Sequence, residues 1–155
     1  ERWDVVTKRD FPESMKELSR FAMVACKNTK SNAIVLCREY KQGCWQVLGM
    51  GAGQPNRVDS LRKLAVPKAR ENLEIAFDEE NPGGDREEWI AAQMGAAVMA
   101  SDAFFPFDDT VREAAAAGIR AIVQPGGSVR DQEVIAAADE LGIAMAFTGM
   151  RHFLH

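Results

Sequence analysis

Residues 116–128 read AAGIRAIVQPGGS, and this stretch decides the fold class. Gly118 ends an alanine-rich segment, an apolar run follows, and a proline–glycine turn then leads into a second alanine-rich segment. This order is typical of a short buried strand between two helices. Strands that alternate with helices of this length indicate parallel pairing in a sheet whose two faces are covered by helices.

The same unit extends in both directions along the chain. Ser128 and Asp131 have the spacing of a capping box, and Gly142 ends the helix that they begin. Asp108–Thr110 can cap the preceding helix. We expect strands near residues 96–100, 119–124 and 143–148 in this half of the chain.

The N-terminal half adds a hairpin. Strands are expected near residues 32–38 and 44–50, with Gly43 in the turn, and helices over 12–27 and 57–75. Pro67 lies inside the second helix and predicts a kink or a junction there. The fold class is therefore α/β: residues 1–155 form a single three-layer α/β/α unit with a mixed five-stranded sheet.

Composition excludes several classes of protein. The chain has 155 residues, of which 46% are hydrophobic and 27% charged, and a formal net charge of −4. Lysines and arginines are dispersed and no apolar run is long enough to span a bilayer, so we expect neither a nucleic-acid partner nor membrane insertion. Three cysteines without a secretory signal predict reduced thiols and a cytoplasmic location.

Two observations concern metals and chain limits. The sequence has no Cys-x-x-Cys pair and only His152 and His155, so we expect no metal site. The first residue is Glu1 rather than methionine, which indicates processing or a start inside a longer polypeptide.

Four polar or glycine-rich segments follow predicted strands. In sheets of this kind ligands bind at the carboxyl ends of the strands, so we expect these segments to converge on a site. They are residues 51–57, 101–109, 124–128 and 148–155.

The two glycine-rich stretches, GMGAGQPNR (49–57) and QPGGS (124–128), each allow two interpretations. One is a backbone cradle for a phosphate, and the other is a tight turn into a helix. The first stretch lacks the Lys-Ser/Thr pair of a P-loop and the spacing G-x-G-x-x-G. Arg57 adds a positive charge at a helix start, where an anion would bind.

The stretch SDAFFPFDD (101–109) is either a piece of core or the wall of a pocket. Consecutive residues of an extended segment face opposite ways, so Phe104 and Phe105 cannot both face one core. A core position is favoured for Phe107 over the other two. The carboxylates of Asp102 and Asp109 either cap helices or accept hydrogen bonds from an amide-rich ligand.

The last stretch, TGMRHFLH (148–155), leaves directly from a buried strand. A chain terminus is usually poorly ordered, but Phe153 is apolar. The guanidinium of Arg151 is suited to gripping a phosphate.

The motifs KSNAIVL (30–36), GAGQ-x-x-R, SDAFFPF, QPGGS-x-R and TGMRHF-x-H follow one another in this order. Together they resemble the C-terminal half of the 5-aminoimidazole-4-carboxamide ribonucleotide (AICAR) transformylase domain. That domain belongs to a family of bifunctional purine-biosynthesis enzymes that also carry inosine monophosphate (IMP) cyclohydrolase activity. The resemblance covers nearly the whole chain and implies a cytidine-deaminase-like subdomain. The deaminase zinc signature is absent, as in that family.

The resemblance implies transfer of a formyl group from 10-formyltetrahydrofolate, as co-substrate, to the 5-amino group of AICAR. Such a site must position a weakly nucleophilic amine, remove a proton and stabilise an oxyanion. By motif, the implied catalytic residues are Asn32 and His155. The implied nucleotide contacts are Asn32, Arg57, Phe104 against the imidazole, Arg151 at the phosphate and Phe153 through its backbone. The implied folate contacts are Arg57, Pro106, Phe107 and Asp109.

The chain departs from the family in the proton-transfer group. The family's Lys-His pair lies in the first half of the transformylase domain, and no Lys-His dipeptide occurs here. The sequence KNTK (27–30) stands where KHVK is frequent, and Leu154 replaces a commonly basic residue. The cyclohydrolase domain is absent too, so these residues do not support that activity.

Three hypotheses remain open. The chain is half of an AICAR transformylase site, completed by further polypeptide, by a separate chain carrying the first half, or by self-association, most simply as a homodimer. Alternatively, it is a non-catalytic nucleotide- or folate-binding module that lacks the proton-transfer pair. In the third hypothesis the motifs only support folding.

Overall fold

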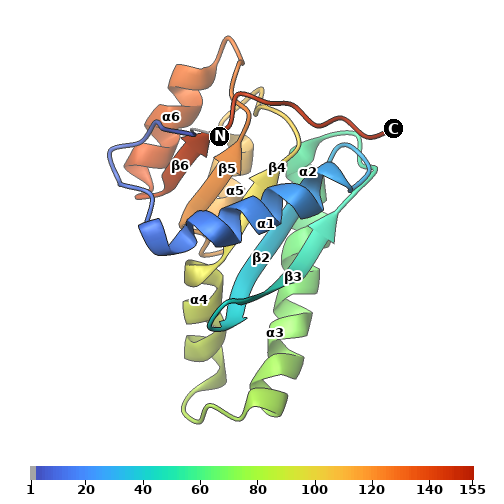
Figure 1. Cartoon of the computed structure of the whole chain (residues 1–155), viewed down its shortest axis with the longest axis vertical. Helices are drawn as coiled ribbons and strands as arrows, with labels where there is room; N and C mark the ends of the chain where they lie inside the picture. The colour runs from blue at the N-terminus through green and yellow to red at the C-terminus, as the bar shows by residue number, and fades with distance from the viewer. Residues whose placement is uncertain (1–2) are drawn as a thin grey trace.

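The computed structural model describes residues 3–155, and its centre is a mixed six-stranded sheet (Figure 1). The strand order is β1-β6-β5-β4-β2-β3. The strands are β1 (Asp4–Val5), β2 (Ile34–Lys41), β3 (Cys44–Gly51), β4 (Val98–Ser101), β5 (Ala121–Gln124) and β6 (Ala144–Phe147).

Pairing divides the sheet into two regions. Strands β4, β5 and β6 are parallel, as the repeated helix–strand units predict. Strands β2 and β3 form the antiparallel hairpin, and β2 joins β4 in the antiparallel sense. The α/β class and the mixed sheet are thus confirmed.

The expected number of strands was wrong. All five expected strands form with slightly shifted limits, but β1 adds a sixth by pairing antiparallel with β6, Asp4 opposite Phe147 and Val5 opposite Ala146. A two-residue strand whose residues are both exposed carries no alternation of apolar and polar residues, so the sequence gives no signal for it.

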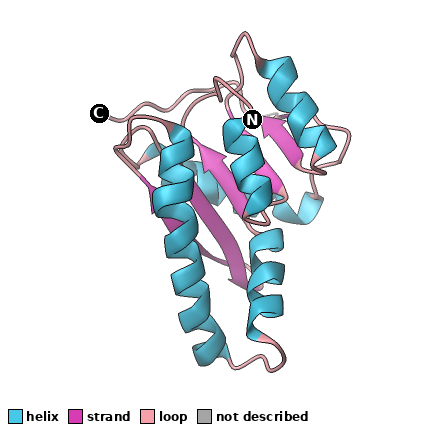
Figure 2. Ribbon diagram, turned by 180° about the vertical axis from the view of Figure 1, so that it is seen from behind, coloured by secondary structure: helices cyan, strands magenta, loops and turns pink. Residues whose placement is uncertain are grey.

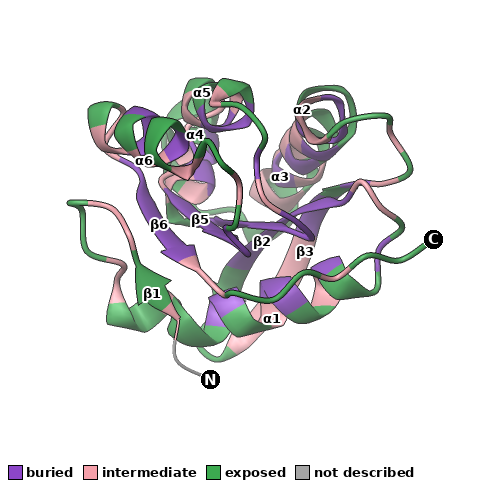
Figure 3. Ribbon diagram, turned by 90° about the horizontal axis from the view of Figure 1, so that it is seen from above, coloured by how far each residue is buried: buried purple, intermediate pink, exposed green. Residues whose placement is uncertain are grey.

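Helices cover both faces of the sheet unequally (Figures 2 and 3). One face carries α1 with the short η1 that precedes it, and the other carries α2 to α6 with η2. The helical segments are η1 (Glu13–Met15), α1 (Lys16–Lys27), α2 (Arg57–Asp59), η2 (Ser60–Ala65), α3 (Val66–Glu80), α4 (Arg86–Ala96), α5 (Asp109–Ala116) and α6 (Asp131–Glu140).

Two hydrophobic clusters correspond to the two faces. Ile34 and Leu36 of β2 point into the cluster beneath α3 to α6, and Val35 and Cys37 point into the cluster beneath α1. This alternation follows from the period of two in a strand, and it shows that β2 is buried on both sides.

The helix after β3 lies unusually close to that strand. A Cβ atom on Gly49 would stand 2.2 Å from the carbonyl oxygen of Ala65, and one on Gly51 would stand 2.0 Å from that of Ser60. These two glycines therefore permit close helix–strand packing. Pro67 marks a junction, because the π-helical segment η2 ends immediately before α3, whose first turn holds the proline.

No helix among residues 3–155 is both long and apolar enough to cross a membrane.

Candidate functional site

The four predicted segments meet along one edge of the sheet. The parallel strands β4, β5 and β6 all end there, and the antiparallel β2 begins there. Ile34 at the start of β2 pairs with Ser101 at the end of β4 and with Gly51 at the end of β3. The residues before β2 and those after β3, β4, β5 and β6 therefore share this edge, at the top of Figure 1.

A cleft of about 420 Å³ opens between the loop that enters α2 and the loop that enters α5. Five residues predicted as site residues line it: Asn32, Arg57, Pro106, Phe107 and Asp109. Pro55, Asn56, Val58 and Thr110 complete its wall. The predicted roles of these residues thus fall on side chains that share one cavity.

Arg57 carries the main charge of the cleft. Its Nε donates a hydrogen bond of 2.9 Å to Oδ1 of Asp102, whose side chain is fully buried. Its Nη2 is buried and has no hydrogen-bond partner among residues 3–155. A buried donor without a partner is uncommon in native proteins, because its desolvation is not compensated. Arg57 is therefore held through Nε, while its buried Nη2 has no partner among residues 3–155.

Asn32 and Asn56 are held by nearby backbone. The Nδ2 of Asn32 donates to the carbonyl of Gln54 at 2.9 Å, which leaves its Oδ1 as an acceptor. The Oδ1 of Asn56 accepts from the backbone N–H of Asp59 at 2.8 Å and so caps α2. Asn56 is a cleft residue that was not predicted, although an asparagine just before a helix is a usual N-cap signal.

The three phenylalanines of SDAFFPF separate into different environments. Phe105 is fully buried in the core, Phe104 is half-buried, and Phe107 is 51% exposed. The favoured core position for Phe107 was therefore wrong, because Phe105 takes it. The guanidinium of Arg130 lies over the ring of Phe107, 4.9 Å from its centroid. Phe104, predicted to stack on the imidazole, is not among the described residues that line the cleft.

The two acidic candidates of this stretch have different environments. Asp102 is fully buried and bonded within the protein, so it is not free to accept from a ligand. Asp109 is exposed on the cleft, and only its Oδ1 accepts from the N–H of Thr110, at 2.8 Å. Its second oxygen remains available.

The C-terminal segment is anchored. The backbone N–H of His152 donates to the carbonyl of Asp102 at 2.8 Å, and Leu154 exchanges hydrogen bonds with Ser31. Phe153 lies 6.0 Å from the guanidinium of Arg57 and stacks with His155. Arg151 and His155 are exposed and lie outside the described lining of the cleft.

The glycine-rich stretch QPGGS is a turn whose amides at residues 126–128 are already bonded. In QPGGS the N–H of Gly126 donates to Gln124 and those of Gly127 and Ser128 donate to Asp131. A Cβ atom on Gly126 would stand 2.5 Å from the ring of Phe147. Packing and turn geometry therefore account for these glycines, which leaves the phosphate-cradle interpretation without free donors in that loop.

The titratable groups near the site do not form a metal centre. Among residues 3–155 no three His, Cys, Asp or Glu side chains are grouped to hold a metal ion. Burial raises the pKa of the Cys26 thiol far above its usual value, and the nearby charge of Asp102 adds to this. This thiol is therefore neutral at ordinary pH and is no nucleophile.

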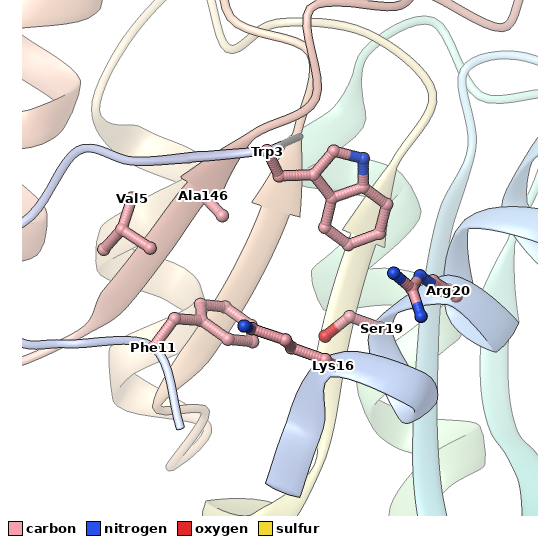
Figure 4. Close-up of a pocket in the computed structure, with 7 residues that line it drawn as sticks. All are labelled: Trp3, Val5, Phe11, Lys16, Ser19, Arg20 and Ala146. Carbon is pink, nitrogen blue, oxygen red and sulfur yellow. The ribbon is translucent and has the colours of Figure 1, made fainter. Parts of the chain in front are cut away.

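A second hollow, of about 270 Å³, lies on the α1 face between that helix and strands β1 and β6 (Figure 4). Trp3 and Phe11 flank it, with Lys16 and Arg20 on α1. Both cations already pair with glutamates of the neighbouring turn, Glu13 and Glu17. None of the predicted site residues lines this hollow, so the cleft at the strand ends is the better candidate.

Comparison with known proteins shows which proteins this chain is similar to. The family model described as "AICARFT/IMPCHase bienzyme" matches residues 1–68. The chain is 47% identical over 153 residues to the bifunctional purine biosynthesis protein PurH of Ligilactobacillus salivarius, covering 99% of this chain and 25% of that protein. It is 52% identical over 151 residues to PurH of Magnetococcus marinus, with 97% and 25% covered. The chain thus spans about a quarter of the length of the curated relatives it matches.

Proposed function

Because the chain belongs to the AICARFT/IMPCHase bienzyme family, we propose that it supplies one wall of a formyl-transfer site in purine biosynthesis. The cleft binds AICAR and 10-formyltetrahydrofolate and holds the amine of the first against the formyl carbon of the second. The single observation that carries this proposal is the cleft in which Asn32, Arg57, Pro106, Phe107 and Asp109 meet.

The free groups of the cleft suit these ligands. The guanidinium of Arg57, bonded among residues 3–155 only through Nε, offers a charged donor to an anionic or carbonyl oxygen, and the Oδ1 of Asn32 offers an acceptor. Phe107 offers an exposed aromatic ring beside the free carboxylate oxygen of Asp109. An aromatic, amide-rich ligand such as a pterin would stack on the ring and donate to the carboxylate.

The proton acceptor is supplied from outside the cleft wall. No histidine or lysine is among the described residues that line the cleft, and His155 lies exposed on the C-terminal segment. Asn32 therefore contributes positioning and Arg57 contributes oxyanion stabilisation, while a general base comes from further polypeptide, a partner chain, or a second copy in a homodimer.

Calorimetric titration tests the binding part of the proposal. The chain should bind AICAR and 10-formyltetrahydrofolate, each more tightly than an Arg57→Lys variant does. Lysine keeps the charge beside Asp102 but lacks the free Nη2. The matched control is Arg70→Lys, because Arg70 pairs with Glu87 on the far helices, outside the lining of the cleft. Absence of binding for both ligands would contradict the proposal.

A second candidate function is a non-catalytic module that binds the nucleotide or the folate, since the described lining of the cleft holds no histidine or lysine. A formyl-transfer assay distinguishes the two, because only a half-site gains activity when the remaining part of a PurH relative is added. Sedimentation over a range of concentrations tests the homodimer separately.

A further inference from the structure

A buried carboxylate, Asp102, lies at the centre of the edge where the motifs meet. Its side chain is 0% exposed. Oδ1 accepts from Nε of Arg57 at 2.9 Å, and Oδ2 accepts from Oγ of Ser31 at 2.5 Å. Each carboxylate oxygen thus accepts a hydrogen bond from a different segment of the chain. Hydrogen bonds to a carboxylate are stronger than those between neutral amides.

Strand pairing places Asp102 there. Ser101 of β4 pairs with Ile34 of β2, and the N–H of Asp102 continues this pairing by donating to the carbonyl of Ala33 at 3.3 Å. The residue after β4 is therefore opposite the residues that precede β2. This explains how Asp102 reaches Ser31 across 71 positions of the sequence.

Ser31 carries the connection to the C-terminal segment. Its Oγ accepts from the N–H of Leu154 at 3.1 Å, and its own N–H donates to the carbonyl of Leu154 at 2.9 Å. The carbonyl of Asp102 accepts from the N–H of His152 at 2.8 Å. Residues 152–154 are thus tied to the Asp102–Ser31 pair by three hydrogen bonds.

We propose that Asp102 and Ser31 are positioning residues that couple the orientation of Arg57 to the seating of the C-terminal segment. Asp102 fixes Arg57 through Nε and so leaves Nη2 without a protein partner. Ser31 fixes Leu154 and so keeps the ring of Phe153 beside the guanidinium, 6.0 Å away. The buried pair Asp102–Ser31 therefore fixes the orientation of Arg57 in the cleft and the position of the segment that carries Arg151 and His155. The ligand-binding consequence rests on the proposed function, and the mechanical coupling does not.

Two substitutions break the same link from its two sides. Ser31→Ala removes the hydroxyl that accepts from Leu154, and Leu154→Pro removes the N–H that donates to it. Leu154 is 42% exposed, so the proline does not disturb the core. Leu154→Ala is the matched control, because it shortens the same side chain and keeps the N–H.

Hydrogen exchange of the intact chain reads the coupling without any ligand. We expect the amide of His152 to exchange about tenfold faster in Ser31→Ala and in Leu154→Pro, since local opening of the segment becomes easier. The double variant should exchange no faster than either single variant, and Leu154→Ala should match the wild type. Amides of β6 should not change. Unchanged exchange at His152, or losses that add in the double variant, would overturn the proposal.

Nucleotide binding by the same variants then tests the effect on the site. Both single variants should bind AICAR about tenfold more weakly than the wild type, the usual effect of losing one interaction. The double variant should bind AICAR no more weakly than either single variant. Additive losses of affinity would show that Ser31 acts on the ligand without the C-terminal segment. If the wild-type chain binds no nucleotide, the proposed function fails, and the exchange experiment alone decides the positioning role.

Discussion

Two arginines lie almost inside the protein, Arg38 within β2 and Arg57 at the start of α2, and they differ in their hydrogen bonds. The side chain of Arg38 is 3% exposed, and its three nitrogens donate to Gln46, Gln93 and Glu80, each at 2.7 Å. The side chain of Arg57 is 12% exposed, yet its Nη2 has no partner among residues 3–155.

The difference indicates that Arg38 has a structural role, while Arg57 belongs to a candidate binding site. The buried guanidinium of Arg38, with each of its three nitrogens bonded, joins β2, β3, α3 and α4 within the protein. Arg57 retains a donor that only a molecule outside these residues can satisfy. The aromatic rings differ in the same way. The ring of Phe107, which lines the cleft with Arg57, is half exposed, while the ring of Trp89 packs against Arg38.

Truncating each arginine should give the largest contrast in stability. Arg57→Ala leaves the Asp102 carboxylate buried with only Ser31 as a donor, so the free energy of unfolding should fall by about 3–5 kcal/mol. Arg38→Ala leaves Glu80, whose side chain is 35% exposed and can be hydrated, so the loss should be about 1–3 kcal/mol. Urea denaturation measures both values, and a larger loss for Arg38→Ala would reverse the comparison.

The exposed Arg151 provides a contrast within the proposed site. It makes no hydrogen bond or ion pair with residues 3–155, so Arg151→Ala should leave the free energy of unfolding nearly unchanged. If Arg151 binds the phosphate, Arg151→Ala should weaken the binding of AICAR by about 1.5–3 kcal/mol, the usual contribution of a charge-assisted hydrogen bond. The dephosphorylated nucleoside should lose much less. Equal losses for the two ligands, measured by calorimetry, would show that Arg151 does not recognise the phosphate.

The sequence predicts the parallel region of the sheet better than the site. Each of β4, β5 and β6 is a short apolar run bounded by glycine or polar residues, a local pattern that determines both the element and its burial. The pair between Arg57 and Asp102 has no such pattern. It depends on β2 lying beside β4, which becomes visible only when the chain is folded.

The phenylalanines show the same limit on a smaller scale. The sequence predicts that Phe104 and Phe105 face opposite ways, and the structure agrees that only Phe105 is in the core. Which phenylalanine is buried depends on how α5 packs over the loop after β4. Local alternation therefore predicts that the ring environments differ, but not which ring is exposed.

Two buried thiols extend the comparison to alkaline pH. Cys37 precedes Arg38 and Cys26 lies near Asp102; burial raises the pKa of Cys37 to about 12 and that of Cys26 further. A thiol with a raised pKa contributes stability that is fully present below its unfolded pKa near 9 and is lost as the pH rises toward the folded value. Between pH 9 and 12 each thiol should lower the free energy of unfolding by up to about 1.4 kcal/mol per pH unit.

Urea denaturation at pH 8, 9 and 10 checks this slope. The variants Cys26→Ala and Cys37→Ala should each remove part of it, because each thiol stays protonated in the folded protein over this pH range while its raised pKa is above it. A slope that persists in the double variant would assign it to other groups.

Only a small effect on stability is expected at Phe107. Its ring is 51% exposed and lies beside the guanidinium of Arg130, so Phe107→Ala should lower the free energy of unfolding by only about 0.5–1 kcal/mol. The matched variant Phe105→Ala removes a fully buried ring and should lower it by about 3–5 kcal/mol. Binding of 10-formyltetrahydrofolate should nevertheless weaken in Phe107→Ala, because the exposed face of the ring is what the cleft offers to a flat ligand. Urea denaturation and calorimetry on one preparation measure both quantities. If Phe107→Ala leaves the affinity for the folate unchanged, the exposed ring does not contact the folate, and the cleft beside Arg57 then binds the nucleotide alone.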